Sequence, residues 1–209
     1  MSKVNDDRRS IRTKKMIRLA LSELIEEKGF NNISVTDITT RADINRGTFY
    51  LHYLDKYDLL EKIENEVIQE LNQYVKDFSY EVSVDPPDII GTITKPMPYM
   101  IKIFEYIKEN STFMKAILGS NGDPKFQIKI KDLIKENIFN KKLIKTFNRE
   151  NMLVPEEFFI SYVLSAHLGI IQYWLESGLK KSPQEMTLIL SKMFFLGPFK
   201  ASGLSSIKD

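Results

Sequence analysis

Residues 42–60 read ADINRGTFYLHYLDKYDLL, and this stretch decides how the amino-terminal part of the chain is interpreted. It places polar side chains, a glycine and several aromatic residues around a short apolar stripe, directly before a long helical pattern. Asp43 and Ile44 predict a tight connection, because aspartate tolerates the left-handed backbone region better than most residues. Asn45 is then expected to cap a short helix over residues 46 to about 52.

The residues before this stretch predict two more helices. A first helix over residues 8 to 28 ends at Gly29 in the left-handed conformation, with Phe30 packing back on its last turn. Ser34, followed three residues later by Asp37, resembles a capping box and starts a second helix that ends near residue 42. The apolar face of the first helix consists of Ile17, Leu21, Leu24 and Ile25.

Two short helices joined by a tight turn, with polar residues on the second, indicate a helix-turn-helix. We expect Ile38, Ile44 and Phe49 to point inward. Gly47 costs about 1 kcal/mol relative to alanine inside a helix, so something is expected to approach the backbone closely there. The side chains left facing outward are Arg46, Thr48, Tyr50 and His52.

Duplex DNA fits these outward residues, because the major groove is just wide enough for one helix. Arg46 is expected to contact a guanine or a phosphate, and Thr48 and Tyr50 to contact phosphates. Lys56 adds a charge at the start of the next helix, and Thr36 lies where a phosphate would meet exposed amide groups. His52 is interpreted as a phosphate contact or a helix-packing residue rather than a catalyst, since the motif places no nucleophile or carboxylate beside it.

Composition supports a globular protein and limits its chemistry. The chain has 209 residues, of which 43% are hydrophobic and 28% charged. It contains no cysteine and two histidines, which excludes disulfides and thiolate metal sites and makes a zinc site unexpected. The net charge is +2, but residues 1–22 contain seven basic and two acidic residues, which suggests a polyanion partner. A solvated basic surface without a partner is the alternative.

The rest of the chain also shows helical spacing, so we predict an all-α protein of about nine helices. A long linking helix over residues 56–78, about 34 Å in length, is expected to belong to two bodies. Residues 79–96 are interpreted as a loop. The predicted domains are residues 1–55, a three-helix DNA-binding domain, and residues 56–209, a helical domain with helices at about 97–110, 111–118, 124–147, 155–177 and 184–196.

Residues 34–60, SVTDITTRADINRGTFYLHYLDKYDLL, resemble the DNA-binding signature of the TetR/AcrR family of bacterial transcriptional regulators. The resemblance runs from about residue 12 to residue 63, and the chain departs from it with Thr39 where many relatives have alanine and Asp43 where they have glycine. Asn45 belongs to the same site as the helix cap. The resemblance implies DNA contacts at Thr36, Arg46, Gly47, Thr48, Tyr50, His52 and Lys56.

The carboxy-terminal half resembles more loosely the regulatory and dimerisation domain of the same family. Residues 166–190, AHLGIIQYWLESGLKKSPQEMTLIL, are similar to a variant frequent in low-GC Gram-positive bacteria, and the resemblance places the last two long helices in a dimer interface. Small residues at Ser165, Ala166 and Gly169 would let a partner helix come close. The expected apolar stripe consists of Met186, Ile189, Leu190, Met193 and Phe194, with an intramolecular core as the alternative.

Aromatic and methionine side chains in the same half suggest an effector pocket, although such residues at helical spacing are usually core. The pocket candidates are Tyr99, Met100, Phe104, Phe113, Met114, Phe126, Tyr162, His167 and Trp174. His167 has a satisfied core histidine as its alternative role. The lysine-rich run over residues 125–145 is interpreted as the solvated face of an amphipathic helix.

These observations predict a cytoplasmic, dimeric repressor that leaves a near-palindromic DNA operator when an effector binds. The competing hypothesis is a co-regulator or activator that acts through a protein partner. We expect no enzyme activity, no cofactor, no metal and no membrane span, since the chain lacks a phosphate loop, a nucleophile elbow and metal-ligand spacing, and its amino terminus has no signal-peptide pattern.

Overall fold

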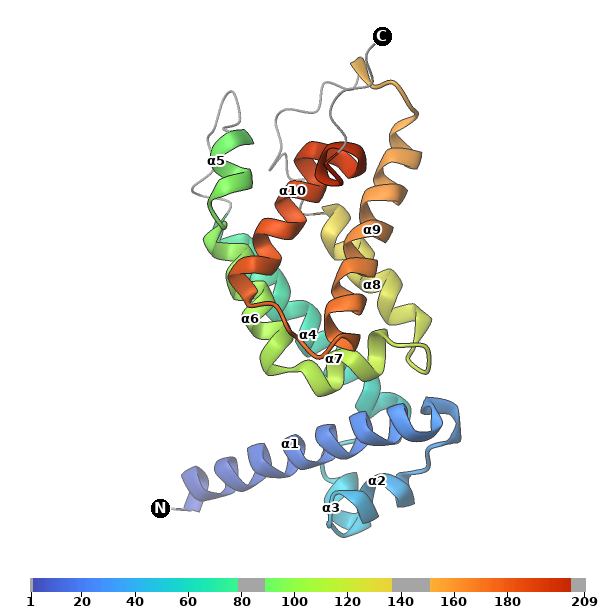
Figure 1. Cartoon of the computed structure of the whole chain (residues 1–209). Helices are drawn as coiled ribbons and strands as arrows, with labels where there is room; N and C mark the ends of the chain where they lie inside the picture. Colours follow the sequence, from blue (N-terminus) through green and yellow to red (C-terminus); the bar gives the residue numbers. More distant parts are fainter. Residues whose placement is uncertain (1, 79–88, 137–150, 204–209) are drawn as a thin grey trace. The chain divides into compact units, whose positions relative to one another are not determined.

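A computed structural model of the chain describes residues 2–78, 89–136 and 151–203, and every regular element in these ranges is helical (Figure 1). The prediction of an all-helical protein is confirmed. In chain order the elements are α1 (Ser2–Lys28), the 3₁₀ helix η1 (Phe30–Asn32), α2 (Val35–Arg41), α3 (Arg46–Tyr50), α4 (Lys56–Phe78), α5 (Ile89–Thr94), α6 (Pro98–Glu109), α7 (Ser111–Leu118), α8 (Pro124–Lys135), α9 (Glu156–Glu176) and α10 (Pro183–Ala201).

One helix lies where the sequence pattern predicts a loop. α5 falls within residues 79–96 and packs against α10. A helix of six residues has little stability by itself, so this tertiary contact, which no local pattern contains, accounts for the difference. Residues 79–88 of the expected loop and residues 137–147 of the expected eighth helix lie outside the described residues.

The chain forms two compact units, and their boundary does not coincide with the predicted division after residue 55. Unit 1 comprises Met1–Gln69 and Asn110–Ile128, and unit 2 comprises Glu70–Glu109 and Lys129–Asp209. The long helix α4 therefore contributes to both units, as expected for a linking helix. α7 and the first residues of α8 belong to unit 1 although they follow α6 of unit 2 in the chain.

Unit 1 is built around α1. The predicted apolar face of α1 is buried, with Ile17, Leu21 and Ile25 each 0% exposed. α1 packs against α2 and also against α7, and Figure 1 shows α2 and α3 together on one side of α1. The inward positions Ile38 and Phe49 are likewise 0% exposed.

The contact between α1 and α7 combines apolar packing with polar links. The guanidinium carbon of Arg18 lies 4.8 Å from the ring centroid of Phe113, a cation–π distance. Lys115 Nζ lies 3.4 Å from a carboxylate oxygen of Glu26, and Asn121 Nδ2 donates to the Glu26 carbonyl at 3.3 Å. α7 is therefore held along the second half of α1.

Unit 2 has its own core, in which α10 packs against α5, α6 and α9. Trp174 of α9 is 2% exposed, and its ring meets Phe104 of α6 edge-on at 5.3 Å. Its indole Nε1 donates to the Lys181 carbonyl at 2.9 Å, so the buried polar group has a partner. Ser182 and Glu185 form a capping box at the start of α10.

α9 is the one helix in the described ranges that is long and apolar enough to cross a membrane, a criterion that the sequence analysis did not expect any segment to meet. The core helices of soluble proteins meet the same criterion. One side of α9 is packed in unit 2, where Val163, Leu164, Leu168 and Trp174 are buried.

Candidate nucleic-acid interface

α2, the turn after it and α3 form a helix-turn-helix whose ends are set by local hydrogen bonds. Ser34 and Asp37 make a complete capping box at the start of α2, as predicted. Asp43 has φ 51, the left-handed conformation expected for the turn. The Asn45 side chain accepts a hydrogen bond from the Gly47 N–H at 2.8 Å, so Asn45 caps α3.

Thr36 and Arg46 come together on the outer surface of this motif. Both side chains are exposed, and the Arg46 guanidinium donates to Thr36 Oγ1. The hydrogen bond joins the first turn of α2 to the first residue of α3. Two residues that the sequence assigns to DNA contact thus form one polar surface.

Gly47 is exposed and lies within α3, and little around it requires a glycine. A Cβ atom built at this position would meet only Asn45 Oδ1, at an ordinary contact distance of 3.5 Å. The space in front of the Gly47 backbone is therefore open on the protein side. This leaves the close approach of another molecule as the physical reason for accepting a poor helix former here.

Two other predicted contact residues of this motif differ in exposure. Tyr50 is 55% exposed, and its ring stands edge-on to Phe49 at 5.5 Å. Thr48 is half-buried.

His52 is half-buried beside Tyr53, with 6.1 Å between ring centroids. Burial lowers the pKa of His52, and the nearby charge of Lys14 lowers it further, so the ring is neutral at pH 7. If His52 meets a phosphate, it does so as a neutral hydrogen-bond donor unless the phosphate raises its pKa.

Lys56 is engaged within unit 1, which the sequence did not reveal. Its Nζ donates to the carbonyl oxygens of Phe30 at 3.1 Å and Asn31 at 3.0 Å, and it lies 5.0 Å from the Phe30 ring centroid. Phe30 itself meets Tyr57 edge-on at 5.5 Å, and Gly29 before it has φ 74 and ψ 149. The expected left-handed helical closure after α1 is therefore replaced by η1, which Lys56 holds against α4.

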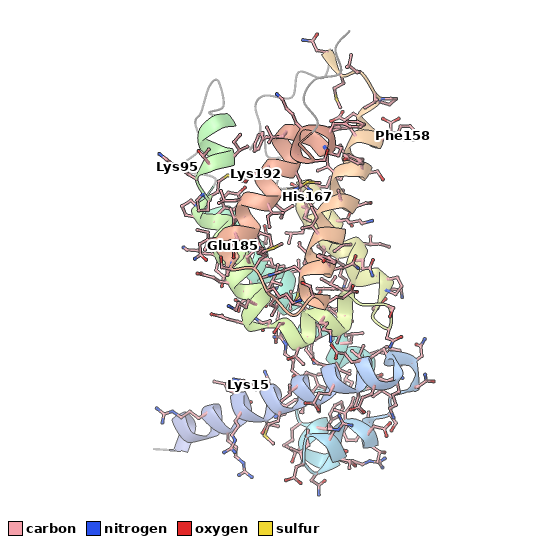
Figure 2. The ribbon with its side chains drawn as sticks, viewed as in Figure 1. Lys15, Lys95, Phe158, His167, Glu185 and Lys192 are labelled. Atoms are coloured by element: carbon pink, nitrogen blue, oxygen red, sulfur yellow. The ribbon has the colours of Figure 1, made fainter. Side chains whose placement is uncertain are left out.

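The basic residues of α1 add positive charge to unit 1. The exposed ones among the described side chains are Arg8, Arg9, Arg12, Lys14 and Lys15, the last labelled in Figure 2. Lys14 acts on the pKa of His52, which shows that it lies close to the end of α3. The positive charge predicted from the sequence thus reaches the helix-turn-helix itself.

The predicted effector-pocket residues do not form one group. Phe113 belongs to unit 1, where its ring packs against Phe126 at 6.3 Å, and Tyr162 is 54% exposed. Phe104 and Trp174 are core residues of unit 2. Burial raises the pKa of Tyr99, another residue of unit 2, to about 12.

His167 is the polar group among these pocket candidates. Its Nδ1 lies 2.7 Å from the Val163 carbonyl, and its ring meets Phe194 of α10 edge-on at 5.7 Å (Figure 2). Burial lowers the pKa of His167. The contacts match the satisfied core histidine that the sequence left open as an alternative.

The predicted dimer residues divide into exposed and buried ones. Ser165 and Gly169 are exposed on α9, whereas Ile189, Met193 and Phe194 of α10 are half-buried. Met186 and Leu190 are each 3% exposed inside unit 2, so they stabilise the subunit and we no longer assign them to an interface. The apolar stripe of α10 has its own core as a partner.

α9 carries a row of exposed aromatic residues that the sequence analysis did not assign to an interface. Phe158, Tyr162 and Tyr173 are 68%, 54% and 72% exposed. With Ser165 and Gly169 they recur every three or four residues, which is the spacing of one helix face. Phe158 projects from the start of this face (Figure 2).

Among the described residues no group of three histidine, cysteine, aspartate or glutamate side chains is arranged to hold a metal ion.

Helix order and capping define a helix-turn-helix protein with a helical carboxy-terminal part, and comparison with known proteins gives the family. Residues 17–63 match the bacterial regulatory proteins of the TetR family, and residues 94–195 match a transcriptional regulator C-terminal region. The chain belongs to the TetR family of transcriptional regulators.

Two curated relatives and one solved structure illustrate the similarity. The uncharacterized HTH-type regulator YxbF of Bacillus subtilis is 39% identical over 185 residues, which cover 86% of this chain and 45% of YxbF. DhaS of Lactococcus lactis, a transcriptional activator of the dhaKLM operon, is 28% identical over 138 residues, which cover 65% of each chain. The matched regions thus span less than two thirds of both relatives. A TetR-family regulator from Syntrophomonas wolfei has the same fold, with a TM-score of 0.60, 20% identity and coverage of 94% of this chain and 98% of its own.

Proposed function

We propose that the protein is a dimeric DNA-binding transcriptional regulator, a repressor that leaves a near-palindromic operator when an effector binds unit 2. The open backbone of Gly47, beside the paired side chains of Arg46 and Thr36, is the observation that carries this proposal. A groove of about 12 Å admits a helix, and a helix without a side chain at its exposed centre can approach a base edge closely. In this proposal the protein acts in the cytoplasm, where bacterial DNA lies.

The contacts are assigned from the geometry of the motif. Arg46 reaches a guanine edge or a phosphate, and its hydrogen bond to Thr36 orients it before DNA arrives. Tyr50 and the basic residues of α1 contact phosphates. Lys56 acts mainly by holding η1 on α4, since two of its three N–H donors are already used within the chain.

The exposed face of α9 supplies the dimer contact in this proposal. Its aromatic side chains provide apolar area, and Ser165 and Gly169 allow a second helix to come close. Ile189, Met193 and Phe194 border this face as secondary contacts. A two-fold axis would present two α3 helices about 34–36 Å apart, one helical turn of DNA.

Release of DNA requires only modest coupling. A hundredfold loss of affinity corresponds to about 2.7 kcal/mol, which one buried aromatic contact made in a single state can supply. The effector candidates in unit 2 are Tyr99, Phe104, His167 and Trp174. α4 is the proposed route, because its residues belong to both units.

Activation through a protein partner is the second candidate, and the similarity to DhaS favours it, because DhaS is an operon activator. The two candidates differ in what binds unit 2 and in the sign of the effect on transcription. A reporter gene placed behind the bound sequence separates them: expression falls with a repressor and rises with an activator.

The proposal is tested by selecting duplexes from a random-sequence DNA library with the full-length protein and measuring their affinity at several salt concentrations. Arg46→Ala is expected to weaken binding at least tenfold, and loss of one phosphate contact lowers the salt slope by about 0.9. Lys102→Ala, which removes an exposed charge from unit 2, is the matched control and should change neither quantity. No enrichment of any duplex would contradict the proposal.

The dimer is tested separately by light scattering. Tyr162→Arg is expected to give a monomer with an unchanged helical spectrum, since Tyr162 is exposed in the isolated chain. Lys192→Ala on α10 is the control and should remain dimeric. A monomeric wild-type protein, or a dimer unaffected by Tyr162→Arg, would contradict this interface.

A further inference from the structure

Leu51 follows directly on the last residue of α3, and its side chain is 80% exposed. Its backbone remains helical, with φ −69 and ψ −20, and its N–H donates to the Gly47 carbonyl at 3.2 Å. The Leu51 side chain therefore follows the angular spacing of α3. Single exposed leucines are common on proteins, so its direction rather than its exposure is informative.

The direction of Leu51 follows from the buried residue between it and Gly47. Phe49 is 0% exposed and marks the inner side of α3. At 100° per residue, Gly47 and Leu51 each lie about 160° from Phe49 and about 40° from one another. Leu51 is thus the side chain at the centre of the outward face, one turn after the open backbone of Gly47.

Side chains on a helix lean toward its amino terminus and cover the turn before their own Cα. Leu51 therefore extends over the surface that Gly47 leaves uncovered. Whatever approaches Gly47 closely must also meet the apolar end of Leu51. Arg46 lies on the adjoining side of the same helix, where it can make the polar contacts that Leu51 cannot.

We propose that Leu51 is a specificity-determining residue that recognises the C5-methyl group of a thymine in the major groove. Leucine has no donor or acceptor, and thymine is the base that presents a methyl group in that groove. The inference rests on the proposed DNA-binding function, and it adds the base and the chemical group that this face selects.

The experiment uses the duplex that the full-length protein selects from a random library, with each thymine replaced in turn by deoxyuridine. This replacement removes only the methyl group. For wild-type protein, one position in each half-site is expected to weaken binding about fourfold. Leu51→Ala should bind the thymine and uridine duplexes equally and keep the wild-type salt slope.

Leu54→Ala is the matched control, because Leu54 is a leucine of similar exposure, 79%, in the turn outside α3. It should keep the full response to uridine. A Leu51→Ala protein that retains the wild-type uridine response, or a selected half-site without a required thymine methyl, overturns the inference and leaves the DNA-binding function intact. If wild-type protein enriches no duplex, both proposals are overturned.

Discussion

Replacing Gly47 by alanine should stabilise the protein and weaken DNA binding at the same time. In the free protein the new Cβ meets only Asn45 Oδ1 at 3.5 Å, so no clash opposes it. Alanine is about 1 kcal/mol more favourable than glycine in a helix interior, which corresponds to an increase in Tm of about 2–4 °C for a chain of this size.

The same methyl group points outward, where the proposal places the duplex in contact with the Gly47 backbone. Inserting a methyl group into a close-packed contact costs about 1–3 kcal/mol, so the affinity for a selected duplex should fall about tenfold or more. Thermal unfolding followed by circular dichroism measures the first effect, and fluorescence anisotropy with a labelled duplex measures the second.

Asn65→Ala is the control for this experiment. Asn65 is exposed on α4 within unit 1, and alanine should raise helix stability there without adding an atom to the α3 face. The control should show a higher Tm and unchanged affinity. A Gly47→Ala protein that is stabilised and still binds DNA within twofold of wild type would refute the close approach at Gly47.

Three further changes test the fold. Asp43→Gly should raise the stability of unit 1 by up to about 1 kcal/mol, because Asp43 has φ 51 and glycine adopts this region without a steric cost; urea unfolding measures it, and a loss of stability would contradict the assignment. Trp174→Phe should destabilise unit 2 by about 1–3 kcal/mol, since the Lys181 carbonyl loses its indole donor, and an unchanged urea midpoint by circular dichroism would count against the packing described. The Ser182 N–H and then Lys181 lower the pKa of Glu185 to about 2 from an ordinary 4.5, so its contribution to stability is present above pH 4.5 and lost as pH falls toward 2. The Tm difference between wild type and Glu185→Gln should shrink over that interval, and a pH-independent difference would be inconsistent with the capping box.

The helix-turn-helix could be predicted from sequence because its determinants are local. The Ser34 box, the Asp43 turn and the Asn45 cap each join residues two to four positions apart, and each is found in the structure. The outward face of α3 followed from the single buried position Phe49. Local chemistry sufficed for these features.

Other features depend on contacts that are distant in the chain. Lys56 meets carbonyl groups 25 and 26 residues away, so no local pattern indicates that its donors are occupied. Met186 and Leu190 form an apolar stripe, but the stripe does not reveal whether its partner is the same chain or another copy. Phe158 and Tyr162 could have been recognised by their helical spacing with Gly169 on α9.

The discontinuity of unit 1 has a consequence for engineering. A chimaera that grafts residues 1–69 onto a foreign sensor would omit α7 and leave Phe113's cation partner, Arg18, and the apolar side of α1 without their native cover. A transplant that also carries residues 110–128 would preserve those contacts. Swapping operator preference between relatives therefore calls for two cuts on either side of α6, or for changing the outer face of α3 alone.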